Sequence, residues 1–204
     1  MITLTLPMTA TEQISQPVSS VSSTARLEEL VLALQERREG ALEILITRTE
    51  KPCFHLALSI LKDRDLSHDA LQEAYFVVYR RIGQLKEPAA FKSWLFRIVS
   101  RCCHDIIRKR SREIETDLEE RDDLVAEMSD QPSDPGQLVT RQEQLRSIFR
   151  KLPEIDRETI ALREVAHLSY EEMSNVLSIP IGTVRSRLAK ARQRFIKAYR
   201  KEQN

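Results

Sequence analysis

The sequence predicts an all-helical protein built as two small domains. Only four glycines and 5% aromatic residues occur in 204 residues, whereas Leu, Glu, Arg, Ala and Gln are plentiful, and this balance favours helices over sheets. Apolar residues make up 41% of the chain and recur at helical spacing in two blocks, which a turn-rich segment separates. A chain of this length buries one moderate core or two small ones, and the separation favours two.

The first 25 residues are expected to form a disordered tail. They are rich in Ser, Thr, Gln and Pro and show no apolar periodicity. They lack the basic start and apolar centre of a signal peptide, and the chain has no long apolar run that could span a membrane. We therefore expect a cytoplasmic protein.

The first helical block covers residues 26–112. Its apolar spacing predicts helices near 26–37, 40–61, 67–82 and 88–110. Pro52 falls inside the second of these segments. Because proline removes a backbone donor and crowds the preceding turn, we expect it to interrupt or bend that helix.

An acidic linker is expected over residues 113–137. Residues 113–134 carry a net charge of −9, and the stretch "DQPSDPGQ" at 130–137 consists of turn formers. Like charges and turn residues oppose compact packing. The linker is therefore predicted to be flexible, to let the two domains move independently in the free protein, and to be the first site of proteolysis.

The second helical block, residues 138–204, has the layout of a helix-turn-helix. Helices are predicted near 138–151, 153–166, 170–177 and 182–200. Ser169 and Glu172 have the spacing of a capping box, which places a helix start at Tyr170. The turn "SIPI" at 178–181 then precedes a second helix that begins near Gly182.

The last predicted helix presents one apolar and one basic face. A helical wheel places on the core side Val184, Leu188, Ala191 and Phe195. The basic residues on the opposite side have no acidic neighbours at helical spacing. An alternative interpretation of this charge is a basic surface helix that binds no partner. In a helix-turn-helix the second helix enters the major groove by its first turns. The residues expected at base edges are Arg185, Ser186 and Ala189. Those expected at phosphates are Thr183, Arg187, Lys190 and Arg194.

A second basic module precedes the linker. Residues 80–112 carry a net charge of +8, and residues 173–204 carry +7, although the whole chain has only +1. On the helix expected after residue 88, a core face of Leu95, Val99, Cys102 and Ile106 lies nearly opposite Arg97, Arg101, His104 and Arg108. Trp94 lies at the edge, where its ring could stack on an unpaired base beside the arginines. The alternative is that Trp94 belongs to the core.

No motif of an enzyme or a metal site occurs. Cys53, Cys102 and Cys103 form no CxxC pair and are odd in number, so we expect buried thiols rather than disulfides or zinc ligands. His104 is not expected to bind a metal, because the neighbouring cysteines point to other faces of the helix. HExxH, GxGxxG, P-loop and GxSxG patterns are absent. We expect no catalytic site, no cofactor and no small-molecule substrate.

Two stretches resemble one protein family, the bacterial extracytoplasmic-function (ECF) sigma factors of the sigma-70 type. The segment "LPEIDRETIALREVAHLSYEEMSNVLSIPIGTVRSRLAKARQRF" resembles their region four, and "DALQEAYFVVYRRI" with "FKSWLFRIVSRCCHDIIRKR" resembles their region two. The resemblance extends from about Leu30 to Tyr199. It implies an alternative sigma factor, which binds core RNA polymerase and directs it to promoter DNA.

The resemblance also implies roles that periodicity does not. The residues expected to dock on the clamp helices of the largest polymerase subunit are Asp69, Gln72, Glu73, Tyr79 and Arg80. Those expected at the minus-ten element are Lys86, Trp94, Arg97, Arg101 and Arg108. Region four would read the minus-thirty-five element and contact the flap of the second subunit. The acidic linker would thread toward the polymerase channels, and an anti-sigma factor is an expected partner.

Two other classes of protein stay open on the sequence alone. A conventional helix-turn-helix regulator would bind duplex DNA without replacing a sigma factor, but this chain lacks the alternating strands of a receiver domain and its first basic module would have no role. A nuclease or a cysteine hydrolase is the other class, and the motifs above disfavour it.

Overall fold

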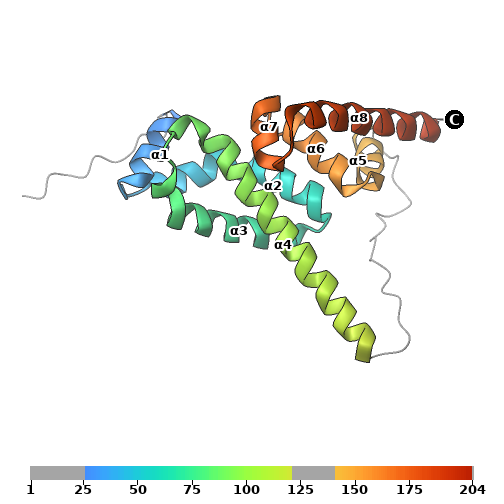
Figure 1. Cartoon of the computed structure of the whole chain (residues 1–204), viewed down its shortest axis with the longest axis horizontal. Helices are drawn as coiled ribbons and strands as arrows, with labels where there is room; N and C mark the ends of the chain where they lie inside the picture. Colours follow the sequence, from blue (N-terminus) through green and yellow to red (C-terminus); the bar gives the residue numbers. More distant parts are fainter. Residues whose placement is uncertain (1–25, 121–140, 204) are drawn as a thin grey trace, which may run out of the picture.

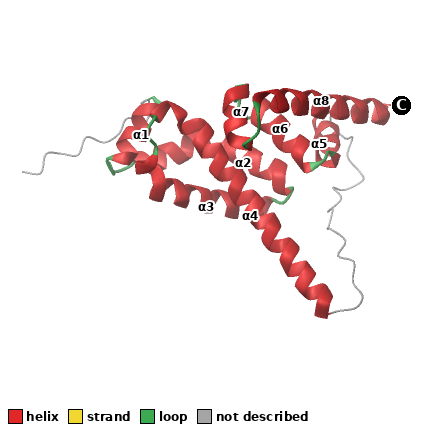
Figure 2. Cartoon of the chain, viewed as in Figure 1, coloured by secondary structure: helices red, strands yellow, loops and turns green. Residues whose placement is uncertain are grey.

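The computed structural model describes residues 26–120 and 141–203, and all regular elements in these two ranges are helical (Figure 2). The all-helical prediction is confirmed. The N-terminal tail and residues 121–137 of the predicted linker lie outside the described residues. Residues 113–120, predicted as the start of the flexible linker, instead continue the last helix of the first block to Glu120, ten residues beyond its predicted end near 110. Within the described ranges, no helix combines the length and the apolarity needed to cross a membrane.

The first bundle contains four helices. They are α1 (Leu27–Gln35), α2 (Ala41–Leu61), α3 (Arg64–Arg81) and α4 (Phe91–Glu120), with two 3₁₀ turns, Ile82–Gln84 and Pro88–Ala90, before α4. Helices α2, α3 and α4 pack on one another. Fully buried side chains between them include Leu45, Leu56, Val78, Phe91 and Leu95. The C-terminal half of α4 projects from the bundle (Figure 1).

Helix α3 begins three residues earlier than predicted, because of its cap. Asp63 Oδ1 accepts hydrogen bonds from the backbone N–H groups of Asp65 (2.9 Å) and Leu66 (3.0 Å). These are two of the donors that the first turn of a helix leaves without an intrahelical partner. The cap fixes the start of α3 directly after α2 and its αL residue Lys62.

Pro52 was expected to interrupt or bend its helix, and the interruption is wrong. Helix α2 runs without a break from Ala41 to Leu61, with Pro52 inside it. A proline in a helix interior costs about 3 kcal/mol. Because α2 packs against α1, α3, α4 and α6, burial of its apolar residues offsets that cost, as tertiary packing commonly does for helices.

The second bundle is the predicted helix-turn-helix with two preceding helices. Its elements are α5 (Arg141–Lys151), α6 (Glu154–Glu164), α7 (Tyr170–Leu177) and α8 (Ile181–Gln203). The capping box is confirmed: Ser169 Oγ accepts from the backbone N–H of Glu172 at 3.1 Å, and Glu172 Oε2 accepts from the N–H of Ser169 at 2.7 Å. Helix α7 has the predicted bounds, and α8 begins one residue before Gly182.

The two bundles pack against each other, a contact that was not predicted; the prediction that they move independently in the free protein stays a prediction. Helix α6 lies against α2, and α7 lies against α4 (Figure 1). The apolar cores of the two bundles form one continuous cluster, in which Leu162 and Met173 join Leu56 and Val99. Linker composition gave no sign of this contact, because the side chains that make it come from the helices.

Candidate nucleic-acid interface

The first turns of α8 are open to solvent on their basic side. Val184, Leu188 and Ala191 are at most 1% exposed, so three of the four residues predicted on the inward face are buried. Phe195, the fourth, is half-buried. The exposed residues of this stretch include Arg185, Ser186, Ala189 and Lys190, while Thr183 and Arg187 are half-exposed. The candidate base-contacting residues therefore share one accessible surface.

Arg185 is held at this surface by an aromatic ring. Its guanidinium carbon lies 5.4 Å from the ring centroid of Tyr170, at the start of α7, and that of Arg163 lies 5.0 Å from the same centroid. The ring of Tyr170 is half-buried, and a cation over an aromatic ring is stabilised by about 0.5–2 kcal/mol between exposed and desolvated sites. Tyr170 thus favours a defined direction for Arg185 at the N-terminal end of α8.

Arg194 differs from the other predicted phosphate contacts. Its Nη1 donates to both carboxylate oxygens of Asp156 in α6, at 2.9 and 2.7 Å. The Asp156 side chain is only 5% exposed, whereas that of Arg194 is 55% exposed. The charge of Arg194 is therefore already paired within the second bundle.

Three of the predicted minus-ten residues meet at a hollow between α3 and α4. Its lining includes Trp94, Arg97 and Arg101 of α4 together with Glu73 and Arg81 of α3. The Trp94 ring is half-buried, with its centroid 6.1 Å from that of the core residue Phe91. Trp94 therefore contacts the core and also borders the hollow. This position is compatible with a base-stacking residue and with a core residue.

The other two predicted minus-ten residues lie outside that hollow. Lys86 is exposed on the segment between the two 3₁₀ turns. Arg108 is exposed farther along α4 and forms an ion pair with Asp105 of the same helix. Neither residue is part of the lining.

The predicted polymerase-binding residues share an exposed face of α3. Asp69, Gln72, Glu73, Tyr79 and Arg80 are all exposed. Sequence reasoning missed Phe76, which lies between them and is 54% exposed, with the guanidinium carbon of Arg80 5.5 Å from its ring centroid. A large apolar residue on the polar side of a helical wheel is the signal that could have identified it.

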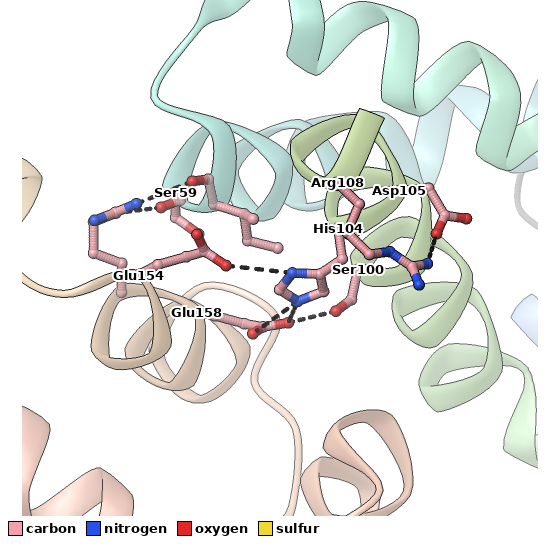
Figure 3. A network of polar contacts seen from close by, with 9 residues as sticks. Ser59, Ser100, His104, Asp105, Arg108, Glu154 and Glu158 are labelled. Atoms are coloured by element: carbon pink, nitrogen blue, oxygen red, sulfur yellow. Dashed lines mark hydrogen bonds and ion pairs between the residues drawn. The ribbon is translucent and has the colours of Figure 1, made fainter. Parts of the chain in front are cut away.

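His104 was predicted on the arginine side of α4, but it faces the second bundle instead (Figure 3). Its Nδ1 lies 3.3 Å from Glu154 Oε1, and its Nε2 lies 3.3 Å from both carboxylate oxygens of Glu158. Glu158 also accepts a hydrogen bond from Ser100 Oγ. The hydrogen bond to Glu158, with the charges of both glutamates, raises the pKa of His104 against the opposing effect of burial.

Arg157 joins the bundles at the end of α2. Its Nε donates to the backbone oxygen of Ser59 (2.5 Å) and its Nη2 to that of Ile60 (3.0 Å), while Nη1 donates to Leu152 O within the second bundle (2.5 Å). We call these cross-bundle contacts the interdomain network; its members are Ser59, Ile60, Ser100, His104, Glu154, Arg157 and Glu158. Sequence reasoning missed it, because adjacent charges on a helix ordinarily indicate a solvated face.

The cysteines are free thiols. Cys53 and Cys103 are buried and Cys102 is half-buried. Burial raises the pKa of Cys102 to about 11 and that of Cys53 to about 12, so neither is a ready nucleophile at neutral pH. Among the residues that the structure describes, no cluster of His, Cys, Asp and Glu could hold a metal ion.

Known proteins resemble both bundles. Residues 45–113 match the family profile described as Sigma-70 region 2, and residues 142–195 match Sigma-70, region 4. The ECF RNA polymerase sigma-E factor of Escherichia coli K12 is 30% identical over 175 residues, which cover 80% of this chain and 89% of that protein. The RNA polymerase sigma-H factor of Pseudomonas aeruginosa is 29% identical over 178 residues, which cover 84% and 92%.

Solved structures share the fold. One is CnrH in complex with the cytosolic domain of CnrY, with a TM-score of 0.58 and 19% identity over 84% of this chain and 95% of that one. Another is the sigma factor RpoE in complex with the anti-sigma factor NepR from Bartonella quintana, with a TM-score of 0.58 and 22% identity over 85% and 94%.

Proposed function

The chain belongs to the ECF RNA polymerase sigma factors, and from that premise we propose how its two bundles divide the work of promoter recognition. As an alternative sigma factor it is a transcription initiation factor rather than an enzyme, and it directs core RNA polymerase to specific promoters. The proposal assigns residues 26–112 to region two, 113–137 to the linker and 138–204 to region four.

Region four reads the minus-thirty-five element through α8. The support is the accessible surface that carries Arg185, Ser186 and Ala189 behind a well-capped α7. Side chains on the first turns of a recognition helix reach base edges. The flanking hydroxyl of Thr183 and the flanking cations of Arg187 and Lys190 lie where phosphates would be contacted. Arg194 contributes less than the others to phosphate binding, because its charge is paired with Asp156.

Region two binds the minus-ten element through α4. Arg97 and Arg101 are exposed and have no ion-pair partner among the described residues. They border the same hollow as the half-buried Trp94. A cationic edge beside an aromatic ring suits a melted strand, because guanidiniums hold the backbone while the ring stacks on an exposed base. Lys86 and Arg108 would extend this contact at either end.

The exposed face of α3 docks on core polymerase. Asp69, Gln72 and Glu73 provide polar groups, and Phe76 adds an exposed apolar side chain among them. A mixed apolar and charged patch on one helix is typical of a protein interface. By family, this surface would contact the clamp helices of the largest subunit, and region four would contact the flap of the second.

An anti-sigma factor is a further proposed partner, and the cytoplasm is the proposed location. Each of the two solved structures described above contains a bound protein, the cytosolic domain of CnrY in one and the anti-sigma factor NepR in the other. Core polymerase and promoter DNA are cytoplasmic in bacteria, so a chain that binds both would act there.

The observation that carries this proposal is that two accessible basic helix faces, on α8 and on α4, lie in different bundles. Purified core polymerase and a promoter library test it. We expect promoter-specific transcripts only when the chain is added, with preferences at both elements. Specific DNA binding by the chain alone, without polymerase-dependent transcripts, would instead support the conventional helix-turn-helix regulator.

A further inference from the structure

We propose that Gln35, the last residue of α1, is a positioning residue for minus-ten recognition. It holds the α3–α4 connection, residues 82–90, in the place from which Lys86 meets DNA. The role given to Lys86 rests on the proposed function, whereas the anchoring of the connection by Gln35 does not. Gln35 lies outside the stretch that matches Sigma-70 region 2, which begins at residue 45.

The side-chain amide of Gln35 donates to two carbonyl groups of the connection. Its Nε2 lies 3.0 Å from Ile82 O and 2.7 Å from Leu85 O. An amide nitrogen carries two hydrogens, so each carbonyl can accept one. The opposite orientation of the amide would place its oxygen against two acceptors, so the surroundings define which way it points. Both donors of Gln35 therefore bind one short segment that lies far from it in the sequence.

The two carbonyls lie at the ends of the first 3₁₀ turn, directly before Lys86. This turn, Ile82–Gln84, is closed by the backbone N–H of Leu85, which donates to Ile82 O at 3.1 Å. Leu85 O belongs to the peptide group that joins Leu85 to Lys86, and a peptide group is planar. The hydrogen bond from Gln35 thus fixes the plane from which the backbone of Lys86 continues.

The connection is buried at its base and exposed at its tip. Ile82 is fully buried and Leu85 is 9% exposed, whereas Gln84 and Lys86 are exposed. Hydrophobic burial is non-directional, so it keeps the two apolar side chains in the core without defining the orientation of the backbone between them. Hydrogen bonds are directional. Those from Gln35 therefore add the orientation that burial alone does not provide.

Helix α1 is a firm support for this contact. Leu30 and Val31 are fully buried and Leu34 is 2% exposed, and α1 packs against α2 and against both 3₁₀ turns of the connection. Just beyond α1, Arg37 Nη1 donates to Tyr79 O at 2.9 Å, and the Arg37 guanidinium carbon lies 4.2 Å from the ring centroid of Tyr79. The end of α1 therefore holds both the last turn of α3 and the connection that follows it.

A connection that sampled several orientations would present Lys86 correctly in only a fraction of molecules. The apparent affinity for DNA falls by the fraction of molecules in the binding-competent state. A promoter with a matched minus-ten element loses most, because a mismatched element has fewer contacts to lose. Release of the connection therefore lowers discrimination at the minus-ten element and leaves discrimination by α8 at the minus-thirty-five element unchanged.

Gln35→Met tests this assignment in the full chain, because methionine keeps an unbranched side chain of similar length but has no donor. Gln35→Lys restores donors and is the rescue variant. The matched control is Thr49→Val in α2. It removes a buried hydroxyl that donates to Leu45 O (2.7 Å) and shares a hydrogen bond with the hydroxyl of Tyr75 (2.9 Å). Circular dichroism checks folding, and Gln35→Ala replaces Gln35→Met if the apolar side chain disturbs the bundle.

Hydrogen exchange in the free chain measures the anchor without polymerase or DNA. We expect the backbone amides of residues 82–90 to exchange roughly tenfold faster in Gln35→Met than in the parent chain, which is the size expected for two lost hydrogen bonds. Exchange in this segment should stay near the parental rate in Gln35→Lys and in Thr49→Val. Unchanged exchange in a folded Gln35→Met chain overturns the proposal.

Transcription with core polymerase and a promoter library measures recognition. We expect the transcript ratio between matched and singly substituted minus-ten elements to fall roughly fivefold or more in Gln35→Met and to recover in Gln35→Lys, with the minus-thirty-five ratio unchanged. An unchanged minus-ten ratio, an equal fall at both elements, or the same fall in Thr49→Val overturns the proposal. A parent chain without minus-ten preference contradicts the proposed function and with it the role in recognition, whereas the exchange measurement still decides whether Gln35 anchors the connection.

Discussion

Arg194 of the recognition helix forms a two-pronged ion pair with Asp156 of α6, in which one nitrogen donates to both carboxylate oxygens. The side chain of Asp156 is buried, whereas that of Arg194 is half-exposed. Removal of the Arg194 side chain therefore leaves the buried carboxylate of Asp156 without its partner. This ion pair connects the C-terminal half of α8 to α6, the helix that packs against α2 of the first bundle.

Arg194→Ala is expected to destabilise region four by roughly 1–3 kcal/mol, because the desolvation penalty of Asp156 stays while its partner is lost. The control is Arg192→Ala on the same helix, whose partner Glu164 is 53% exposed and whose loss is expected to cost about 0–1 kcal/mol. Urea unfolding followed by circular dichroism measures both. Equal stability of the two variants would contradict the structural role given to Asp156.

Arg185→Ala is expected to cost roughly 1–3 kcal/mol of promoter binding and to relax the preference at one or two minus-thirty-five positions. Lys190→Ala is the comparison, since a lost phosphate contact weakens all promoters about equally and lowers the salt dependence of binding. Transcription from a promoter library at two salt concentrations separates these outcomes. A change of sequence preference in Lys190→Ala, with only scaled activity in Arg185→Ala, would mean that α8 enters the groove differently.

Trp94→Ala is expected to reduce promoter opening, with a loss of roughly 1–3 kcal/mol for a stacked base, while Trp94→Phe retains most activity. A template already unpaired at the minus-ten element distinguishes melting from stability, because it should rescue the alanine variant if stacking promotes strand separation. Trp94 is the only tryptophan in the chain, so quenching of its fluorescence by single-stranded DNA reports the contact directly. No rescue, together with lowered stability, would assign Trp94 to the core alone.

The contact between the bundles is expected to weaken as pH rises. Both ring nitrogens of His104 face carboxylates, those of Glu154 and Glu158, so the imidazolium, which donates from both nitrogens, is the favoured form. Arg108 on the same helix opposes this effect on the pKa of His104, but the net direction is upward. A folded-state pKa above the unfolded value of about 6.5 gives stabilisation that is fully present below that value and is lost as pH rises through the folded-state pKa.

Fluorescence energy transfer between dyes on cysteines at the exposed positions Glu50 of α2 and Lys197 of α8, in a Cys102→Ser background, measures this dependence when it is followed from about pH 6 to pH 9. We expect the closed fraction, in which the bundles are in contact, to fall with rising pH in the parent chain. His104→Gln, which cannot gain charge, should flatten the profile. A closed fraction that rises with pH, or the same slope in both chains, would exclude His104 as the titrating group.

Local features of the fold followed from the sequence because local chemistry determines them. The Ser169 and Glu172 capping box fixed the start of α7, and the wheel of α8 identified Val184, Leu188 and Ala191 as buried. Both patterns depend on residues three or four positions apart. The early start of α3 also has a local cause, the Asp63 cap, and an aspartate just before an apolar helical pattern could have indicated it.

The contact between bundles could not be predicted in the same way. Arg157 binds backbone carbonyls at Ser59 and Ile60, and a carbonyl carries no mark in the sequence. In the sequence, three adjacent charges at 156–158 resemble an ordinary solvated face. The structure shows that each has a different partner: Arg194 for Asp156, the backbone of α2 for Arg157, and side chains of α4 for Glu158. Pro52 failed as a helix breaker for a related reason, since long-range packing outweighed a local cost.

Helix α4 has a mechanical consequence for the chain that follows it. It runs for 30 residues, about 45 Å at ~1.5 Å per residue, and its far half stands clear of the bundle (Figure 1). The chain therefore leaves region two from the tip of a rod rather than from the surface of the bundle. Because each helical residue turns the chain by about 100°, a one-residue insertion within 114–120 would move that exit point to a different azimuth around the axis of α4, whereas a seven-residue insertion would nearly restore the azimuth.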